Sequence, residues 1–229
     1  MFAALAALLL FVAFLLLLLV TLSVPIIKSI FLFRLTANLG SSLLATGANA
    51  TANFGVWGYC IPSINFAVMG IDRATASHCS GTHLGYTLDS DVANALHATN
   101  FENVISRTTT AALVLHPIAA ALTLFAFLIS LFIFRLPSNA TSRLPAQCIL
   151  SIGLLAVILT TVVFLIDVGF VAVVRSKVHD ASRGHLALAW GNAVWMTLGA
   201  TIALWLAMIQ AGAAACACGL RSRSKQEKF

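Results

Sequence analysis

The side chains that could do chemistry in this chain are a cysteine pair, the histidines beside it, and a few polar groups inside hydrophobic segments. Cys60 and Cys79 are the only cysteines between the first two hydrophobic segments. A lone cysteine pair in one loop predicts a disulfide, which needs an oxidising compartment. The alternative is a metal site made by His78, Cys79 and His83, but this spacing matches no familiar zinc pattern. We therefore expect a Cys60–Cys79 disulfide and no bound metal.

The sequence lacks the motifs of the common catalytic sites. It has no phosphate-binding glycine loop, no nucleophile elbow, no paired-cysteine redox motif and no helix with metal-ligand spacing. Catalysis within a membrane would also need more polar residues than the hydrophobic segments provide. We therefore expect a protein that is not an enzyme, with no cofactor and no small-molecule substrate.

Three polar residues lie inside hydrophobic segments, where ionisable groups are costly and usually functional. His116, Asp167 and Asn192 belong to the second, third and fourth segments. Each is expected about seven residues from the outer end of its helix, roughly 10 Å deep at 1.5 Å per residue. One interpretation is a layer of interhelical hydrogen bonds, typically about 0.6 kcal/mol each. The other is a proton-responsive element, because a histidine beside an aspartate can change its charge across physiological pH.

Composition places these residues in a membrane protein. Hydrophobic residues make up 60% of the chain and charged residues only 9%, which is more apolar surface than a soluble domain can bury. A helix needs about 20 apolar residues to cross a hydrocarbon core of roughly 30 Å. Four such stretches divide the chain into a first span (1–28), a large loop (29–109), a second span (110–134), a short loop (135–147), a third span (148–174), a short loop (175–185), a fourth span (186–215) and a basic tail (216–229).

The formal net charge of +6 raises the question of nucleic-acid binding. The basic residues are scattered, however, and their only cluster is in the tail, at Arg221, Arg223, Lys225 and Lys228. A basic tail directly after a hydrophobic segment usually faces anionic cytoplasmic lipid. We therefore expect membrane lipids, and no nucleic acid, as partners of this chain.

The first hydrophobic segment and the large loop decide the expected orientation. No Lys or Arg precedes Lys28, and the apolar run exceeds the about 7–15 residues of a signal peptide, which favours a retained span. The cysteine pair and the glycosylation acceptor at Asn49 place the large loop outside. The distribution of Lys and Arg decides little, and a second acceptor at Asn139 is interpreted as chance. Both termini are therefore expected in the cytoplasm.

The large loop is predicted to contain a small β-sheet. Its β-prone runs are 30–35, 54–61 and 64–69, while 43–53 is predicted to be a mobile loop and 90–106 a short helix. A Cys60–Cys79 disulfide closes a loop of about 20 residues and stabilises it by about 3 kcal/mol. The expected fold is an all-α membrane protein, a four-helix transmembrane bundle with a small disulfide-stapled extracellular β-sheet.

Two features of the fourth span suggest packing and modification. Small residues recur every fourth position, at Gly199, Ala203, Ala207 and Ala211, and such a face lets helix backbones approach closely. Cys216 and Cys218 lie at its inner end beside Arg221. Cysteines in this position are candidates for palmitoylation, and the alternative is that they are unmodified small residues.

The run Phe54-Gly55-Val56-Trp57-Gly58-Tyr59-Cys60 followed by a second cysteine resembles the claudin-type signature of four-span proteins. Arg107 lies before the second span, where claudin-like proteins also tend to carry arginine. The closer resemblance is to the fungal branch of that superfamily, the PalI-type pH-response regulators and the related eisosome tetraspan proteins. It rests on this run, on Pro25-Ile26-Ile27-Lys28 at the end of the first span and on Gly85-Tyr86 after the second cysteine.

This resemblance implies a claudin-like fold in the plasma membrane of a fungus. It also implies one of two functions: assisting a multispan receptor in sensing alkaline pH, or organising membrane microdomains or cell contacts through self-association. The motif residues would have structural roles. Trp57 would pack or anchor at the lipid boundary, Gly55 and Gly58 would admit close strand approach, and Cys60 would form the staple.

Overall fold

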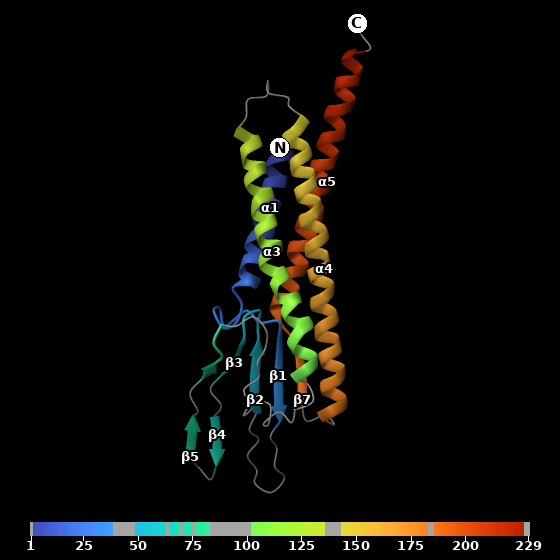
Figure 1. Cartoon of the computed structure of the whole chain (residues 1–229). Coiled ribbons are helices and arrows are strands. Elements are labelled where there is room, and N and C mark those ends of the chain that lie inside the picture. Colours follow the sequence, from blue (N-terminus) through green and yellow to red (C-terminus); the bar gives the residue numbers. More distant parts are fainter. Residues whose placement is uncertain are drawn as a thin grey trace. The chain divides into compact units, whose positions relative to one another are not determined.

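The computed structural model describes residues 2–38, 49–62, 65–68, 71–74, 77–82, 102–135, 143–182 and 186–226. Its four long helices are α1 (Phe2–Thr21), α3 (Glu102–Arg135), α4 (Arg143–Ser182) and α5 (Asn192–Gln226) (Figure 1). Each contains a stretch long and apolar enough to cross a membrane: Ala4–Thr21, Leu113–Phe132, Leu150–Ser176 and Asn192–Ala213. The prediction of a four-span membrane protein is confirmed.

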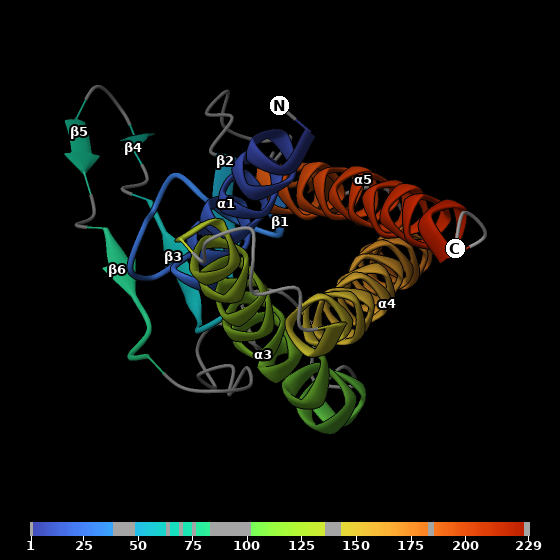
Figure 2. The same cartoon turned by 90° about the horizontal axis from the view of Figure 1, so that it is seen from above.

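The chain divides into two units, which are described separately. The helical unit comprises Met1–Leu18, His116–Phe164 and Met196–Phe229. Viewed along their axes, the four helices surround a common core (Figure 2). Small residues dominate that core, which lets the helices approach closely. Its buried members are Leu10, Ala13, Leu17, Ala119, Ala120, Ala126, Val157, Ala200, Ala203, Leu204 and Ala207.

The predicted small-residue face of α5 lies mostly within this unit. Ala203 and Ala207 are buried in the core, and Ala211 is half-buried. A Cβ added at Gly199 would lie 3.5 Å from Cδ1 of Leu16, which is ordinary van der Waals contact. Leu16 of α1 therefore lies beside Gly199, and packing of the whole face within the chain stays a prediction.

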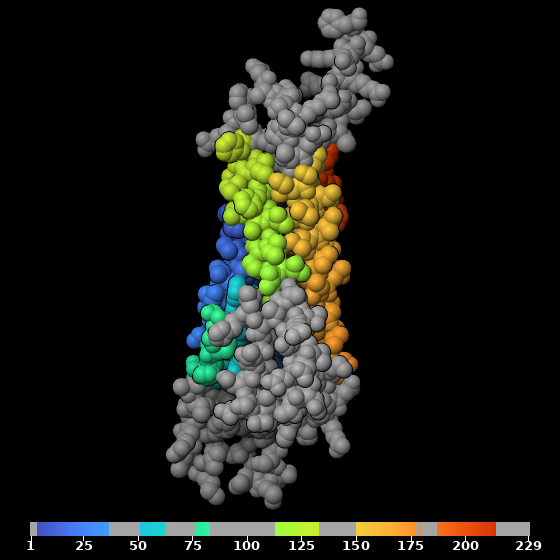
Figure 3. All heavy atoms as spheres, viewed as in Figure 1, coloured from blue at the N-terminus to red at the C-terminus, as the bar shows by residue number. Residues whose placement is uncertain are grey.

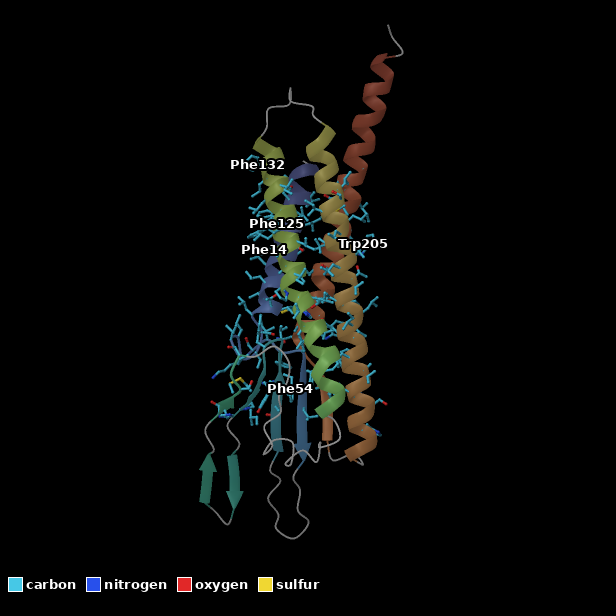
Figure 4. All side chains as sticks on the ribbon, viewed as in Figure 1. Phe14, Phe54, Phe125, Phe132 and Trp205 are labelled. Carbon is cyan, nitrogen blue, oxygen red and sulfur yellow. A yellow bond between two sulfur atoms is a disulfide. The ribbon has the colours of Figure 1, made fainter. Side chains whose placement is uncertain are left out.

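Large apolar side chains cover the outside of the helical unit, as expected for a surface in lipid. Phe125 and Phe132 are exposed on α3, and Trp205 is exposed on α5 (Figure 4). In the space-filling view, the side chains of α3 and α4 lie against each other along one face (Figure 3). The indole N–H of Trp205 donates to Oγ1 of Thr161 at 3.2 Å, so its polar group is satisfied between two helices.

The second unit, Leu19–Leu115 with Leu165–Trp195, contains the β-structure. The strands are β1 (Phe33–Asn38), β2 (Asn49–Phe54), β3 (Tyr59–Ile61), β6 (His78–Cys79) and β7 (Leu186–Trp190), in the order β6-β3-β2-β1-β7. All neighbours in this sheet are antiparallel. A separate hairpin pairs β4 (Asn65–Val68) with β5 (Ile71–Ala74).

The sheet has one apolar face, as period-two alternation requires. Phe33 pairs with Phe54 on β2 and with Trp190 on β7. The rings of Phe33 and Phe54 stack with centroids 4.6 Å apart, and Phe170 of α4 meets Phe33 edge-on at 5.8 Å. Aromatic packing thus fixes the sheet against the part of α4 that belongs to this unit.

Three expectations about local structure were wrong. The fourth span was expected from Leu186, but 186–190 form β7 and the helix begins at Asn192. Residues 49–53, expected in a mobile loop, belong to β2. Residues 102–106, expected at the end of a short surface helix, begin α3. For 49–53 and 186–190, pairing with β1 overrode local composition, for example in the burial of Leu188 through pairing with Leu35.

Candidate functional site

The predicted tryptophan motif packs against the turn that ends α1. Two of its backbone N–H groups donate hydrogen bonds to that turn. The N–H of Val56 donates to Oγ of Ser23 at 2.9 Å, and the N–H of Trp57 donates to the carbonyl of Val24 at 3.3 Å. The indole N–H of Trp57 donates to the carbonyl of Thr21. The last carbonyls of a helix lack partners within it, so Trp57 caps α1 with its side chain.

Trp57→Phe is expected to remove this cap while keeping the aromatic body. The Thr21 carbonyl would lose the indole N–H as a donor at a buried residue, which costs about 1–2 kcal/mol. The measurement is the midpoint of thermal unfolding of the purified protein in detergent. Trp205→Phe is the matched control, because it also removes one indole N–H but does so on an exposed surface. Equal shifts for the two variants would contradict the capping role.

Glycine allows the motif to approach the turn this closely. A Cβ on Gly55 would lie 2.7 Å from both the Cβ and the backbone nitrogen of Val24, closer than real Cβ atoms come. A Cβ on Gly58 would likewise overlap Oγ of Ser80. That hydroxyl accepts from the N–H of Tyr59 at 3.0 Å, and the N–H of Ser80 donates to the Tyr59 carbonyl at 2.9 Å.

The disulfide lies directly beside this motif. Cys60 of β3 and Cys79 of β6 are cross-strand partners, bonded with their Cα atoms 4.0 Å apart. The predicted disulfide is confirmed. His78 is exposed beside it, His83 lies outside the described residues, and among the described residues no group of three His, Cys, Asp or Glu could hold a metal. The pair of cysteines thus joins β6 to the rest of the sheet.

The start of α5 forms a second contact with the segment that follows α1. Asn192 donates through Nδ2 to the carbonyl of Ser29 at 2.8 Å, and its Oδ1 accepts from the N–H of Phe31 at 3.0 Å. The N–H of Ala193 donates to the carbonyl of Phe31 at 3.1 Å. Asn192 therefore joins the start of α5 to the segment after α1 through backbone groups of that segment.

This position corrects the sequence interpretation of Asn192. It was expected about seven residues deep in a helix, but it is exposed and is the first residue of α5. The difference arises because the five preceding residues, Leu186–Trp190, form a strand. The sequence contained a signal for this role, since asparagine directly after Gly191 is typical of a helix start.

His116 and Asp167 are both buried, as expected of polar groups inside spans. His116 of α3 is 1% exposed and precedes Pro117, and Asp167 of α4 is 5% exposed. His116 belongs to the helical unit and Asp167 to the unit that contains the sheet. A shared polar layer therefore stays a prediction.

Several predicted residues lie where the structure describes no side chain. Arg107 is within α3, Asn49 is the first residue of β2, and Cys216 and Cys218 are within α5. The second acceptor, Asn139, is outside the described residues. The proposed glycosylation and palmitoylation of these positions stay predictions.

Together the contacts form what we call the docking hub, in which the turn at Ser23–Val24 and the segment Ser29–Leu32 bind the tryptophan motif and the start of α5. Its polar groups are backbone amides and carbonyls, the Ser23 hydroxyl, the Trp57 indole and the Asn192 carboxamide, so it supports positioning of the sheet. Sequence reasoning identified Trp57 and Gly55. It missed Ser23, Ser80 and Gly191, which carry no local signal for contacts this distant.

Comparison with known proteins is consistent with this architecture. The model of the SUR7/PalI family matches residues 2–207 of the chain. A relative named pH-response regulator protein palI/RIM9, from Pyricularia oryzae (strain 70-15 / ATCC MYA-4617 / FGSC 8958), is 33% identical over 165 residues. The match covers 71% of this chain and 19% of that protein, so the chain corresponds to about a fifth of the relative's length.

Proposed function

Because this chain belongs to the SUR7/PalI family, we propose that it is a non-enzymatic regulator of the response to ambient pH in the plasma membrane of a fungus. The observation that carries the proposal is the 33% identity to a protein named as a pH-response regulator. The four spans make the chain a multi-pass membrane protein, which suits a role in communicating the state of the medium to the cell.

The docking hub suggests how such a regulator works. In the proposed orientation, the disulfide-stapled sheet lies outside and both termini lie in the cytoplasm. The tryptophan motif binds the end of α1, and the backbone beside β1 binds the start of α5. Contact of the sheet with an external partner would therefore act directly on the ends of two spans. The finer proposal is that this partner is a multispan receptor for alkaline pH.

The functional test is complementation in a fungal strain that lacks its own PalI-type protein. Restored growth at alkaline pH is the expected result. A chain that reaches the plasma membrane and does not restore growth would overturn the proposal. The sheet-to-span contact can be tested in the same strain with Asn192→Ala, which is expected to weaken the rescue at unchanged surface amount.

Affinity capture in mild detergent separates the two candidate functions. Recovery of a multispan receptor supports regulation. The family also includes SUR7-type proteins, and recovery of coat proteins of membrane microdomains, or of assemblies of this chain alone, would support an organising function and contradict the receptor proposal.

Proton sensing by the buried polar groups is tested with near-isosteric variants. Asp167→Asn and His116→Gln are expected to shift the external pH at which the response begins while leaving surface expression unchanged. Thr160→Val is the control, because this buried hydroxyl donates only to the Ala156 carbonyl of its own helix. If both variants respond as the unmodified chain does, the two residues serve packing alone.

A further inference from the structure

Arg34 is an exposed cation that its neighbours hold in one orientation. It is the second residue of β1 and lies on the face opposite the apolar face of the sheet. Its Nε donates to Oδ1 of Asn53 at 2.8 Å, and Asn53 itself is only 8% exposed. Its guanidinium carbon lies 4.7 Å above the ring centroid of Phe31. A buried amide and an aromatic ring together fix the plane of this guanidinium.

This arrangement leaves the terminal amino groups of Arg34 available. Among the described residues, these groups make no hydrogen bond and no ion pair. A guanidinium held through Nε presents two parallel N–H donors at its other end, the geometry that binds phosphate or carboxylate oxygens in pairs. Most exposed arginines lose considerable side-chain entropy on binding, and this one is already ordered.

The guanidinium lies at the level where a span begins. Its ring partner Phe31 has a backbone N–H and a carbonyl bonded to Asn192 and Ala193. These are the first two residues of the candidate span Asn192–Ala213. The end of a span marks the edge of the hydrocarbon core, and the lipid headgroups occupy the next several ångströms. We take the start of this candidate span as the edge of the hydrocarbon core, which puts Arg34 near the level of the lipid headgroups.

The described segments around Arg34 carry no negative charge to compete for it. The segments 19–38, 49–62 and 186–195 contain no Asp or Glu. Lys28, in the turn before β1, is a second exposed cation. We infer that Arg34 is a binding site for the phosphate of an anionic phospholipid headgroup, organised by Asn53 and Phe31. Lipid phosphate fits better than a protein carboxylate because the site lies at the membrane edge.

The test is native mass spectrometry of the full chain in detergent with added phosphatidylglycerol, whose only charge is its phosphate. Arg34→Gln is expected to weaken binding about tenfold, as loss of a charge-assisted hydrogen bond of about 1.4 kcal/mol implies. Arg175→Gln is the matched control, because this arginine is also exposed and lies at the end of a candidate span, but it makes no contact that orders it among the described residues. We expect it to change binding less than twofold.

A charge-preserving variant tests the orientation of Arg34. Phe31→Leu keeps the backbone contacts and the positive charge, and it is expected to weaken binding about threefold. Because Arg34→Gln also removes the donor to the buried Oδ1 of Asn53, its unfolding midpoint is expected to fall. Binding of every variant is therefore measured well below its own unfolding midpoint. Equal losses for Arg34→Gln and Arg175→Gln, or no loss for Arg34→Gln, would overturn the inference.

Two further outcomes distinguish other occupants of the site. In the first, glycerol phosphate added at the same concentration as the lipid displaces it. That result would show that the site binds soluble phosphate and is not specific for a membrane lipid. If Arg34→Gln leaves lipid binding intact but abolishes a complex with another protein, the site binds a protein carboxylate. Either result contradicts the inference, which does not depend on the role of the chain in pH response.

Discussion

Gly191→Ala is expected to be among the most destabilising single-methyl changes in this protein. Gly191 lies between β7 and α5, and its N–H donates to the carbonyl of Leu32 at 2.8 Å. An added Cβ would lie 2.5 Å from the carbonyl carbon and oxygen of Leu32 and would also overlap the carbonyl oxygen of Phe31. These are backbone atoms of the docking hub, and they cannot move without breaking the contacts of Asn192 and Ala193.

The expected cost of Gly191→Ala is about 3 kcal/mol or more, the upper part of the range for overpacking. For a chain of this size that lowers the midpoint of thermal unfolding by roughly 6–12 °C. The readout is thermal unfolding of the purified protein in detergent, followed by tryptophan fluorescence.

Gly169→Ala is the control for Gly191→Ala. Gly169 is an exposed residue of α4, and a Cβ there would have nothing within 4 Å. Because alanine favours a helix over glycine by about 1 kcal/mol, its midpoint should be unchanged or slightly higher. Equal destabilisation by the two substitutions would show that the close approach at Gly191 is unimportant.

Removal of the disulfide is expected to have the second large effect. Cys60 and Cys79 are 19 residues apart, and opening a loop of that length costs about 3 kcal/mol in the chain-entropy treatment. The double variant Cys60→Ser with Cys79→Ser should therefore unfold at a clearly lower temperature. The sheet is small and cannot supply a sufficient core of its own, so the loss is expected to disorder β6 and loosen the tryptophan motif.

A reducing agent separates loss of the disulfide from other effects of the substitutions. Reductant should lower the unfolding midpoint of the unmodified chain toward that of the double variant and leave the double variant unchanged. Strong sensitivity of the double variant to reductant, or no sensitivity of the unmodified chain, would contradict the stabilising role of the Cys60–Cys79 bond.

Much of the architecture followed from the sequence because its signals are local. Each span is a continuous apolar stretch, because unsatisfied polar groups are costly in hydrocarbon. Each span can therefore be predicted from its own residues. The first span was expected to end with residues 25–28, and α1 ends at Thr21. The disulfide could be predicted because the loop contains only two cysteines.

The start of the fourth span was misjudged because residues 186–190 are as apolar as the helix that follows. Leu-Ala-Leu-Ala-Trp suits a buried helix by composition, and nothing nearby distinguishes the two states. It becomes a strand because it pairs with β1, about 150 residues earlier in the sequence. The same pairing brings Asn192 and Gly191 to the segment after α1.

Hydropathy and the two loop cysteines were thus sufficient to predict a four-span membrane protein with a disulfide-bonded β-rich loop that carries a tryptophan motif. The contacts that hold this loop appear only in the folded chain: the indole of Trp57 binds the end of α1, and Asn192 binds the backbone of Ser29 and Phe31. Hydropathy and cysteine count are properties of short stretches of sequence. Backbone hydrogen bonds between distant segments depend on the register of the whole sheet.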